Sequence, residues 1–243
     1  MNLYREQGVV LRTWKLGEAD RIVVLLTQGE GKVRAVAKGV RKTKSRFGGR
    51  LEPFSHVDLS LYRGRELDII TQAEVITPFR ALREDYDRVV AGTAMLEAVD
   101  QVAQEREAAI RLYLLLVRAL RALDGGPRDP SVVLDAFLLK LMALEGYRPA
   151  VAECAGCGAS DQPARCFSIV RGGGLCERCR SGQESTLDAA TMPLLAALLG
   201  DDLDTTAQRD PAPPSRREAG ALVKGYVEYH LDRRLRAYPL VAR

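Results

Sequence analysis

Histidine is scarce in this chain of 243 residues, in which only His56 and His230 occur. Neither lies near a pair of cysteines, and the patterns H-E-x-x-H and H-x-E followed by P-C-x-x-C are missing. A phosphate-binding glycine loop is missing too, because Gly172-Gly173-Gly174 is not followed by Lys and Ser or Thr. These absences argue against a zinc hydrolase, a deaminase or an ATPase. We expect a protein that is not an enzyme, with two structural histidines.

Long apolar runs are also lacking. No stretch reaches the roughly 18 apolar residues of a membrane span, and the start MNLYREQGVVLRTWK has no signal-peptide core followed by a cleavage site. We therefore expect a cytoplasmic protein with no membrane partner. Repeats and low-complexity tracts are absent, and 47% hydrophobic with 28% charged residues is typical of ordinary folded proteins. The length favours two domains.

Positive charge is concentrated in the first third of the chain. Residues 1–80 contain 15 Lys or Arg against 9 Asp or Glu, whereas residues 81–146 contain 8 against 11 and residues 147–243 contain 13 against 12. The first segment therefore has a balance of +6, while the whole chain has only +4. This asymmetry predicts that a polyanion binds to the N-terminal segment.

The N-terminal segment has the pattern of a small β-barrel. Short β-branched runs alternate with glycine-bearing turns up to Pro78, where the pattern ends. Five strands in this arrangement predict a closed five-stranded barrel over residues 1–79, either an OB-fold or an SH3-like barrel. The predicted strands are Gly8–Lys15, Arg21–Gln28, Lys32–Gly39, Ser55–Tyr62 and Glu66–Ile76.

Residues 80–243 have a helical period, which predicts an irregular helical domain without a coiled coil. Asp124-Gly125-Gly126-Pro127 is typical of a helix end, and the proline-rich segment 210–215 is predicted to be a loop. The overall fold class is thus α+β with two domains. The predicted helices are 82–104, 107–123, 131–146, 187–199 and 215–236.

Two cysteine pairs interrupt the helical pattern. C-A-G-C at 154–157 and C-E-R-C at 176–179 are separated by 18 residues, which is the spacing of a four-cysteine zinc site. The alternative is two unrelated redox-active pairs. Four thiolates fill the zinc tetrahedron, so we predict one structural Zn²⁺ within 150–182, next to a short hairpin strand at 166–170. The fifth cysteine, Cys166, is expected to pack as a small apolar residue. The predicted ligands are Cys154, Cys157, Cys176 and Cys179.

The segment Lys32–Arg50 holds eight basic residues and no acidic residue. Its first basic side chains alternate along a strand and share a face, and the others follow in a loop. Such a patch is expected to neutralise phosphates without sequence preference, although a solvated charged loop is the alternative. Among nearby aromatics we expect Phe47 to stack on unpaired bases, whereas Trp14, Phe54 and Tyr62 could equally be core. The predicted DNA-binding residues are Lys32, Arg34, Lys38, Arg41, Lys42, Lys44, Arg46, Phe47 and Arg50.

Six short motifs follow one another along almost the whole chain. They are G-V-V-L at 8–11, L-G-E-A-D-R at 16–21, G-K-V-R-A-V-A-K-G-V-R at 31–41, S-R-F-G-G-R-L-E-P-F at 45–54, G-Y-R-P at 146–149 and G-G-G-L-C at 172–176. In this order the motifs resemble the RecO family of bacterial recombination mediators. The order is more specific than any single motif.

The resemblance implies an N-terminal OB-fold and a helical domain with a zinc-binding insertion. It also implies a DNA repair and recombination mediator that binds single- and double-stranded DNA, anneals complementary strands and, with RecR, helps to load RecA onto strands coated by single-stranded-DNA-binding protein. Such a protein has no small-molecule substrate and is associated with the nucleoid. Some family members lack the cysteines, so zinc is not expected to be essential for the shared activity.

By the same resemblance, the basic strand and loop residues become candidate DNA contacts, and some of them could instead face RecR. The competing hypothesis is a protein-interaction scaffold that has a structural zinc and no direct annealing activity. Affinity for a polyanion separates these two functions.

Overall fold

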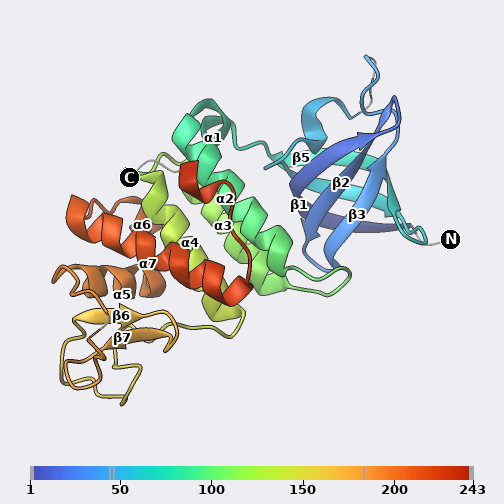
Figure 1. The fold of residues 1–243 in the computed structure, drawn as a ribbon. Coiled ribbons are helices and arrows are strands. Elements are labelled where there is room, and N and C mark those ends of the chain that lie inside the picture. The colour runs from blue at the N-terminus through green and yellow to red at the C-terminus, as the bar shows by residue number, and fades with distance from the viewer. Residues whose placement is uncertain (1–2, 44, 46, 183, 241–243) are drawn as a thin grey trace.

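The computed structural model describes residues 3–43, 45, 47–182 and 184–240. A β-barrel lies at one end and a group of helices at the other, with a small two-stranded hairpin at the far side of the helices (Figure 1). Within the described ranges, no helix is both long enough and apolar enough to cross a membrane.

The barrel closes because its first strand is long enough to pair on both sides. The first half of β1, Leu3–Val9, pairs with β4, and the second half, Gly8–Leu16, pairs with β2. The strand order β1-β2-β3-β5-β4 with a parallel β3–β5 pair is that of an OB-fold, which decides against the SH3-like alternative. The strands are β1 (Leu3–Leu16), β2 (Asp20–Thr27), β3 (Gly31–Ala37), β4 (His56–Tyr62) and β5 (Asp68–Thr77).

β2 is buried on both faces over most of its length, and so is β1 from Gly8 to Leu11, unlike the strands of an isolated barrel. Val23 and Leu25 point into the barrel core, whereas Val24 and Leu26 pack outward against the helices. This explains the continuous apolar run in β2, because a strand covered on both sides does not alternate with polar residues. The barrel and the helices therefore share one hydrophobic boundary.

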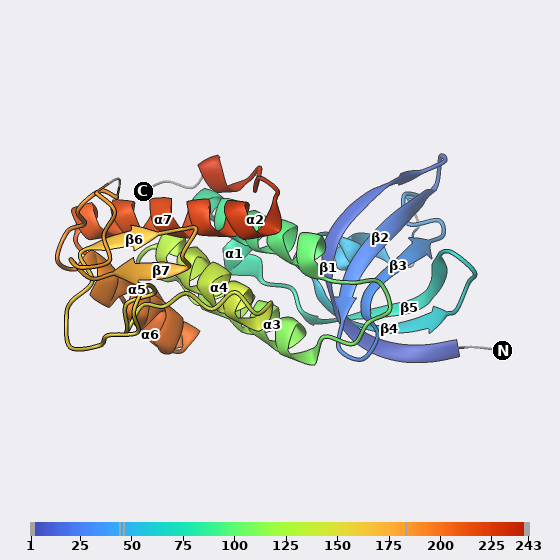
Figure 2. The same ribbon diagram turned by 60° about the horizontal axis from the view of Figure 1, so that its bottom comes forward.

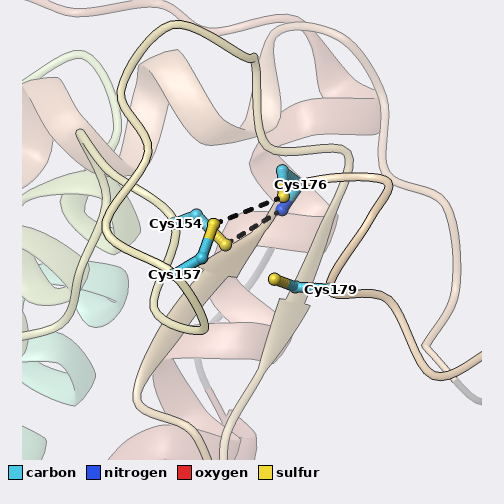
Figure 3. A group of neighbouring side chains, drawn as sticks. All are labelled: Cys154, Cys157, Cys176 and Cys179. Carbon is cyan, nitrogen blue, oxygen red and sulfur yellow. Dashed lines mark hydrogen bonds between the residues drawn. The ribbon is translucent and has the colours of Figure 1, made fainter.

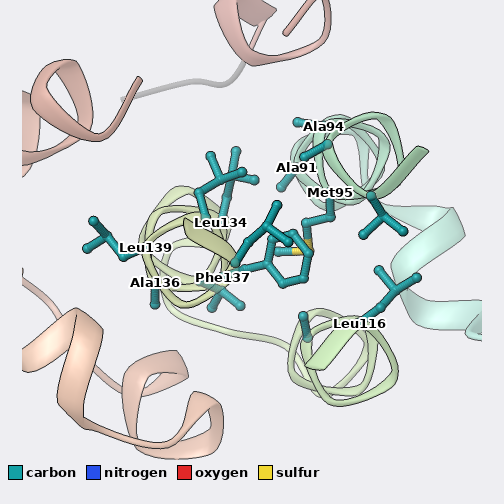
Figure 4. Packing of buried hydrophobic residues seen from close by; sticks show 14 of the residues in the cluster. Ala91, Ala94, Met95, Leu116, Leu134, Ala136, Phe137 and Leu139 are labelled. Atoms are coloured by element: carbon teal, nitrogen blue, oxygen red, sulfur yellow. The ribbon is translucent and has the colours of Figure 1, made fainter. Parts of the chain in front are cut away.

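The helical region is built around α4, which is buried almost all round. Phe137 is fully buried and packs between α2 and α3, close to Met95 and Leu116 (Figure 4). Because few polar residues interrupt its sequence, α4 contacts neighbours on every side. The helices are α1 (Arg80–Glu84), α2 (Tyr86–Val102), α3 (Ile110–Asp124), α4 (Pro130–Leu144), α5 (Thr191–Gly200), α6 (Leu203–Ala207) and α7 (Pro213–Leu231).

Two helix predictions differ from the structure in a physically clear way. The predicted helix 82–104 is divided into α1 and α2 at Asp85, whose extended backbone and side chain cap the N-terminus of α2 by accepting the N–H of Arg88. The predicted helix 215–236 ends at Leu231, because Asp232 adopts a left-handed conformation (φ 50°). The short helix α6 was not predicted, since five residues are too few to show a period.

The segment 103–109, which joins α2 to α3, reaches across to the barrel (Figure 2). The N–H of Lys32 in β3 donates to the carbonyl of Gln104 at 3.2 Å, and the N–H of Arg106 donates to the carbonyl of Lys32 at 3.0 Å. Only glycine fits at position 31, because an added Cβ would lie 1.8 Å from the Glu107 carbonyl oxygen. The segment thus ties the helices to β3.

The predicted insertion forms a hairpin between α4 and α5. Its strands are β6 (Cys166–Ser168) and β7 (Gly173–Leu175), so the predicted strand 166–170 is present but shorter. Strands of three residues bury little apolar surface, and the local core consists of Cys154, Cys166, Leu175 and Cys176. Of the residues in the two strands, Phe167 packs into the core of the helical region, so the insertion buries little apolar surface of its own.

Candidate metal centre and nucleic-acid interface

The four predicted metal ligands come together from two turns. The ligand sulfurs of Cys154, Cys157, Cys176 and Cys179 all lie within 4.8 Å of one another, and Figure 3 shows the side chains converging on one point. All four are free thiols. The Cys157 and Cys176 sulfurs are 3.8 Å apart, and a tetrahedral site with zinc–sulfur bonds of about 2.3 Å requires sulfurs about 3.8 Å apart. The residues fit a tetrahedral thiolate site.

The surroundings of the sulfurs favour thiolate ligands. The N–H groups of Cys176 and Gly156 each donate to the Cys154 sulfur at 3.4 Å. Backbone N–H donation, foremost from Cys176, lowers the pKa of the Cys154 thiol to about 6. In contrast, hydrogen bonds to the neighbouring cysteine side chains, foremost Cys157, raise the pKa of Cys179 to about 12. One thiolate thus opposes ionisation of the next, and a divalent cation at the centre would offset this repulsion.

Glycine is required by crowding in the first turn. A Cβ added at Gly156 would lie 2.9 Å from the Cβ of Cys179. Gly158 has φ 72°, a left-handed conformation that glycine adopts without strain. Cys166 is fully buried and is not among the converging sulfurs, so its prediction as a small apolar core residue is confirmed. All four donors come from the chain, which makes this a closed site.

The basic strand residues lie on the outer face of the barrel, as their alternation predicts. Val33 and Ala35 face the barrel interior, which places Lys32 and Arg34 outside. The Lys32 ammonium donates to the backbone carbonyl of Asp100 at 2.8 Å and lies 3.6 Å from its carboxylate, and the Lys32 side chain is only 16% exposed. Lys32 is therefore held in the junction with α2, a role that its sequence pattern did not predict.

Arg34 is partly engaged by the helical region as well. Its guanidinium lies 3.6 Å from the Glu105 carboxylate, but the Arg34 side chain remains 40% exposed. An exposed ion pair of this kind contributes little to stability, so another anion can easily replace the Glu105 carboxylate. Arg34 stays accessible to a phosphate.

The basic loop after β3 is exposed over most of its described length. Lys38, Lys42 and Arg50 are exposed, and so is Arg41. The Arg41 guanidinium donates to the carbonyls of Gly17 and Glu18, so Arg41 also fastens the loop to the β1–β2 turn. Two further predicted contacts, Lys44 and Arg46, lie outside the described residues.

The prediction that Phe47 stacks on bases is wrong. Phe47 is 1% exposed and lies in the barrel core beside the residues of β3 and β4. Its ring closes the barrel from the end of the basic loop, followed by the short 3-10 helix η1 (Gly48–Leu51). A large apolar side chain gains more from burial than from exposure in a charged loop. Phe47 thus anchors the basic loop to the barrel core and is not exposed on the loop.

The other aromatics near the patch have three different environments. Phe54 is 7% exposed and packs in the barrel–helix boundary, whereas Tyr62 is 42% exposed. Trp14 is partly buried on the outside of the barrel, where the guanidinium groups of Arg12 and Arg34 lie 5.0 Å and 6.0 Å from its ring centre. Arg12 was not among the predicted contacts, although its spacing of two residues from Trp14 is visible in the sequence.

Comparison with known proteins decides the family. The family model described as "Recombination protein O N terminal" matches residues 1–79, and that described as "Recombination protein O C terminal" matches residues 83–239. A "DNA repair protein RecO" from Nocardioides sp. is 51% identical over 246 residues, which cover 99% of this chain and 100% of that relative. The chain belongs to the RecO family. Relatives of the same name from Frankia casuarinae and Streptomyces avermitilis are 48% and 47% identical, with both chains covered completely.

The two matched regions of this RecO-family chain correspond to its two structural parts. The N-terminal match covers the closed barrel, and the C-terminal match covers the helices together with the cysteine hairpin. The resemblance stated from the sequence motifs is therefore confirmed. The two histidines lie elsewhere than the metal ligands: His56 bonds to Tyr113, and His230 packs among tyrosines including Tyr226.

Proposed function

We propose that this protein is a DNA repair and recombination mediator that binds single- and double-stranded DNA without sequence preference and anneals complementary strands without ATP. The basic loop that follows β3 carries this proposal, because it contains no acidic residue, extends from an OB-fold barrel and exposes Lys38, Arg41 and Lys42. The family's name as a DNA repair protein supports the same function. Under this proposal the protein has no catalytic residue and works in the cytoplasm, at the nucleoid.

The proposed partners follow from membership of the RecO family. With RecR, the protein would help to load RecA onto single strands coated by single-stranded-DNA-binding protein. The cations of the basic loop bind either DNA or RecR. A loop variant that loses affinity for one of these partners and keeps affinity for the other would show which one they bind.

We propose that the metal held by the four cysteines is zinc in a structural role. Four thiolates are the ligand set that selects Zn²⁺, and the closed tetrahedron leaves no position for a reacting water. The hairpin's small core gives the ion a stabilising role. Elemental analysis of the purified protein is expected to find about one zinc per chain.

A scaffold without DNA affinity is the second candidate function. It is favoured by the engagement of Lys32 and Arg34 with acidic residues of the helical region, which reduces the free positive charge on the barrel. Against it stand the described loop cations Lys38, Arg41, Lys42 and Arg50, which are exposed and have no acidic residue in their own segment. The two candidates differ in their affinity for a polyanion.

The test measures the affinity for a labelled single-stranded oligonucleotide over a range of salt concentrations. The variant Lys38→Ala/Lys42→Ala/Lys44→Ala removes loop charges and spares Arg41, which fastens the loop. Each neutralised phosphate contributes about −0.7 to the log–log salt slope, so the variant's slope is expected to be shallower by about 2.

The matched control is Arg80→Ala/Arg118→Ala/Arg217→Ala, which removes the same charge from exposed positions on α1, α3 and α7. It is expected to keep the wild-type slope. Equal slopes for both triple variants, or a wild-type affinity that does not depend on salt, would reject the proposal.

A further inference from the structure

A cleft of about 1110 Å³ lies at one side of the boundary between the barrel and the helical region. Its walls come from β1, from α2 and from the segment after α7. Figure 1 shows that this last segment runs back along α2. The floor of the cleft is apolar and includes Leu11, Phe54 and Leu96. This cleft is distinct from the basic loop that follows β3.

Arginine dominates the rim of the cleft. Arg12 contributes from β1, and Arg233, Arg234 and Arg236 contribute from the C-terminal segment. All four are exposed. Arginine suits phosphate recognition because its planar fork donates several hydrogen bonds to one anion.

The two acidic residues of the cleft are already used to position the arginines. The carboxylate of Glu97 accepts the backbone N–H groups of Arg236 and Ala237 at 3.0 Å and 3.1 Å. The carboxylate of Asp100 accepts the Arg12 guanidinium at 2.8 Å. The cleft thus has four guanidinium groups against two carboxylates, and both carboxylates already accept hydrogen bonds from the protein.

Trp14 does not line the cleft but lies next to Arg12, which does. Trp14 pairs with Ile22 across β1 and β2, and Ile22 pairs with Val36 across β2 and β3. The three side chains therefore form one row across the outer face of these strands. Arg12 belongs to the cleft and also lies over the Trp14 ring, and Arg34 reaches the same ring from β3. The row thus links the cleft to the strand that leads into the basic loop.

We propose that this cleft and Trp14 form a binding site for a single nucleic-acid strand. Trp14 stacks on an unpaired base, and Arg233, Arg234 and Arg236 neutralise the phosphates on either side of it. The proposal rests on the proposed DNA-binding function and adds a second contact region to the loop. An apolar floor and an aromatic ring favour unpaired bases, because the bases of a duplex are stacked on each other and cannot reach the ring.

The structure provides its own reporter, because Trp14 is the only tryptophan of the chain. The wild-type protein is titrated with a labelled single-stranded oligothymidine, and binding is followed by the anisotropy of the label while tryptophan emission is recorded. We expect emission to be quenched in step with binding. An abasic strand of the same length is expected to bind more weakly and to leave the emission unchanged, because it has phosphates but no bases.

Variants separate the contribution of the phosphate contacts from that of stacking. Arg233→Gln/Arg234→Gln/Arg236→Gln is expected to lower single-strand affinity about tenfold and to make the salt slope shallower by about 2. Trp14→Leu preserves an apolar side chain and is expected to lower affinity about fivefold or more, as loss of one stacked base does. Arg80→Gln/Arg118→Gln/Arg217→Gln is the charge-matched control.

The outcomes distinguish this inference from the proposed function. Normal binding of the oligothymidine with unchanged tryptophan emission would overturn the cleft site and leave DNA binding by the loop intact. The cleft site is likewise overturned if the arginine triple variant binds the oligothymidine like its control. Absence of any binding would overturn both. The emission measurement needs no variant, so it decides even if Trp14→Leu does not fold.

Discussion

Phe47 lies at the end of a loop rich in cations, yet its ring belongs to the barrel core. A buried aromatic of this size stabilises the folded state by its apolar area and leaves a cavity when it is removed. The ring therefore anchors the loop, whereas the loop cations are the ones proposed to bind DNA. Substitutions at the two kinds of position are expected to give different phenotypes.

Phe47→Ala is expected to lower the free energy of unfolding by about 3–5 kcal/mol, the usual cost of truncating a buried phenylalanine. Urea unfolding followed by circular dichroism measures it. The control Tyr62→Ala truncates an aromatic that is 42% exposed and is expected to cost less. A loss below about 1 kcal/mol for Phe47→Ala would contradict its place in the core.

His56 makes stability depend on pH. It is 4% exposed, its Nε2 lies 2.7 Å from the Tyr113 hydroxyl, and its Nδ1 has no partner among the described residues. Burial, helped by the Arg121 guanidinium, lowers the pKa of His56 from 6.5 to about 4. The unfolded chain therefore takes up this proton at a higher pH than the folded chain does. The resulting stability is complete above about pH 6.5 and is lost as the pH falls toward about 4.

On acidification from about pH 7 to about pH 4.5, the wild type is expected to lose about 2 kcal/mol more stability than His56→Gln does. Urea titrations of both proteins at each pH measure the difference. His230 titrates in both proteins, so its contribution cancels. Parallel losses in the two proteins would show that His56 is not the group responsible.

At the scale of elements, the junction between β3 and α2 is fixed by one central acid. Asp100 at the end of α2 receives Arg12 and Lys32, whereas Glu105 in the following segment pairs with Arg34 at the surface. The first carboxylate is 19% exposed and the second 51%. The two carboxylates are therefore expected to differ in their contribution to stability. An exposed ion pair is screened by solvent, whereas a buried charge that loses its partner is costly.

Asp100→Ala is expected to destabilise the protein by about 1–3 kcal/mol, since it leaves the Lys32 ammonium in the junction without a carboxylate. The matched control Glu105→Ala is expected to change stability by about 0.5 kcal/mol or less. Chemical denaturation of both variants checks the contrast. Similar effects of the two substitutions would mean that Lys32 is not held by Asp100.

The proposed zinc would stabilise the cysteine hairpin more than any other element, because its four ligands all lie there. A strong chelator, or Cys176→Ser, is expected to lower the melting temperature and to expose the hairpin to protease cleavage within residues 150–182. The barrel shares no ligand with the hairpin, so affinity for single strands is expected to stay within about twofold of wild type. A folded, zinc-free protein that no longer binds DNA would refute the purely structural role.

The sequence predicts correctly those features that depend on residues close together in the chain. The cysteine pairs were identified because two residues within each pair are enough to direct both sulfurs to one metal. The five strands were also found, but β1 begins at Leu3 instead of Gly8, because residues 3–7 become a strand only through pairing with β4. Pairing between distant segments leaves no mark in a window of a few residues.

The same limit explains the errors at the candidate site. Asp100 is 68 residues away from Lys32 along the chain, so nothing near Lys32 indicates that it is engaged. The charged sequence neighbours of Phe47 predict exposure, but contacts with distant strands bury its ring. The cleft was missed because its walls come from β1, α2 and the C-terminal segment. Tertiary contacts decide which basic residues remain free for a ligand.

For the molecule as a whole, the basic loop lies on the barrel, and the hairpin with the four converging cysteines lies at the far side of the helices (Figure 1). This separation leads to the central claim that annealing depends on the basic loop of the barrel. The direct measurement is the rate at which two labelled complementary oligonucleotides anneal without ATP, followed by resonance energy transfer. The proteins compared are the wild type, Lys38→Ala/Lys42→Ala/Lys44→Ala and Arg80→Ala/Arg118→Ala/Arg217→Ala. We expect the loop variant to anneal about tenfold more slowly than the other two at moderate salt. Equal rates for all three proteins would contradict this dependence on the loop.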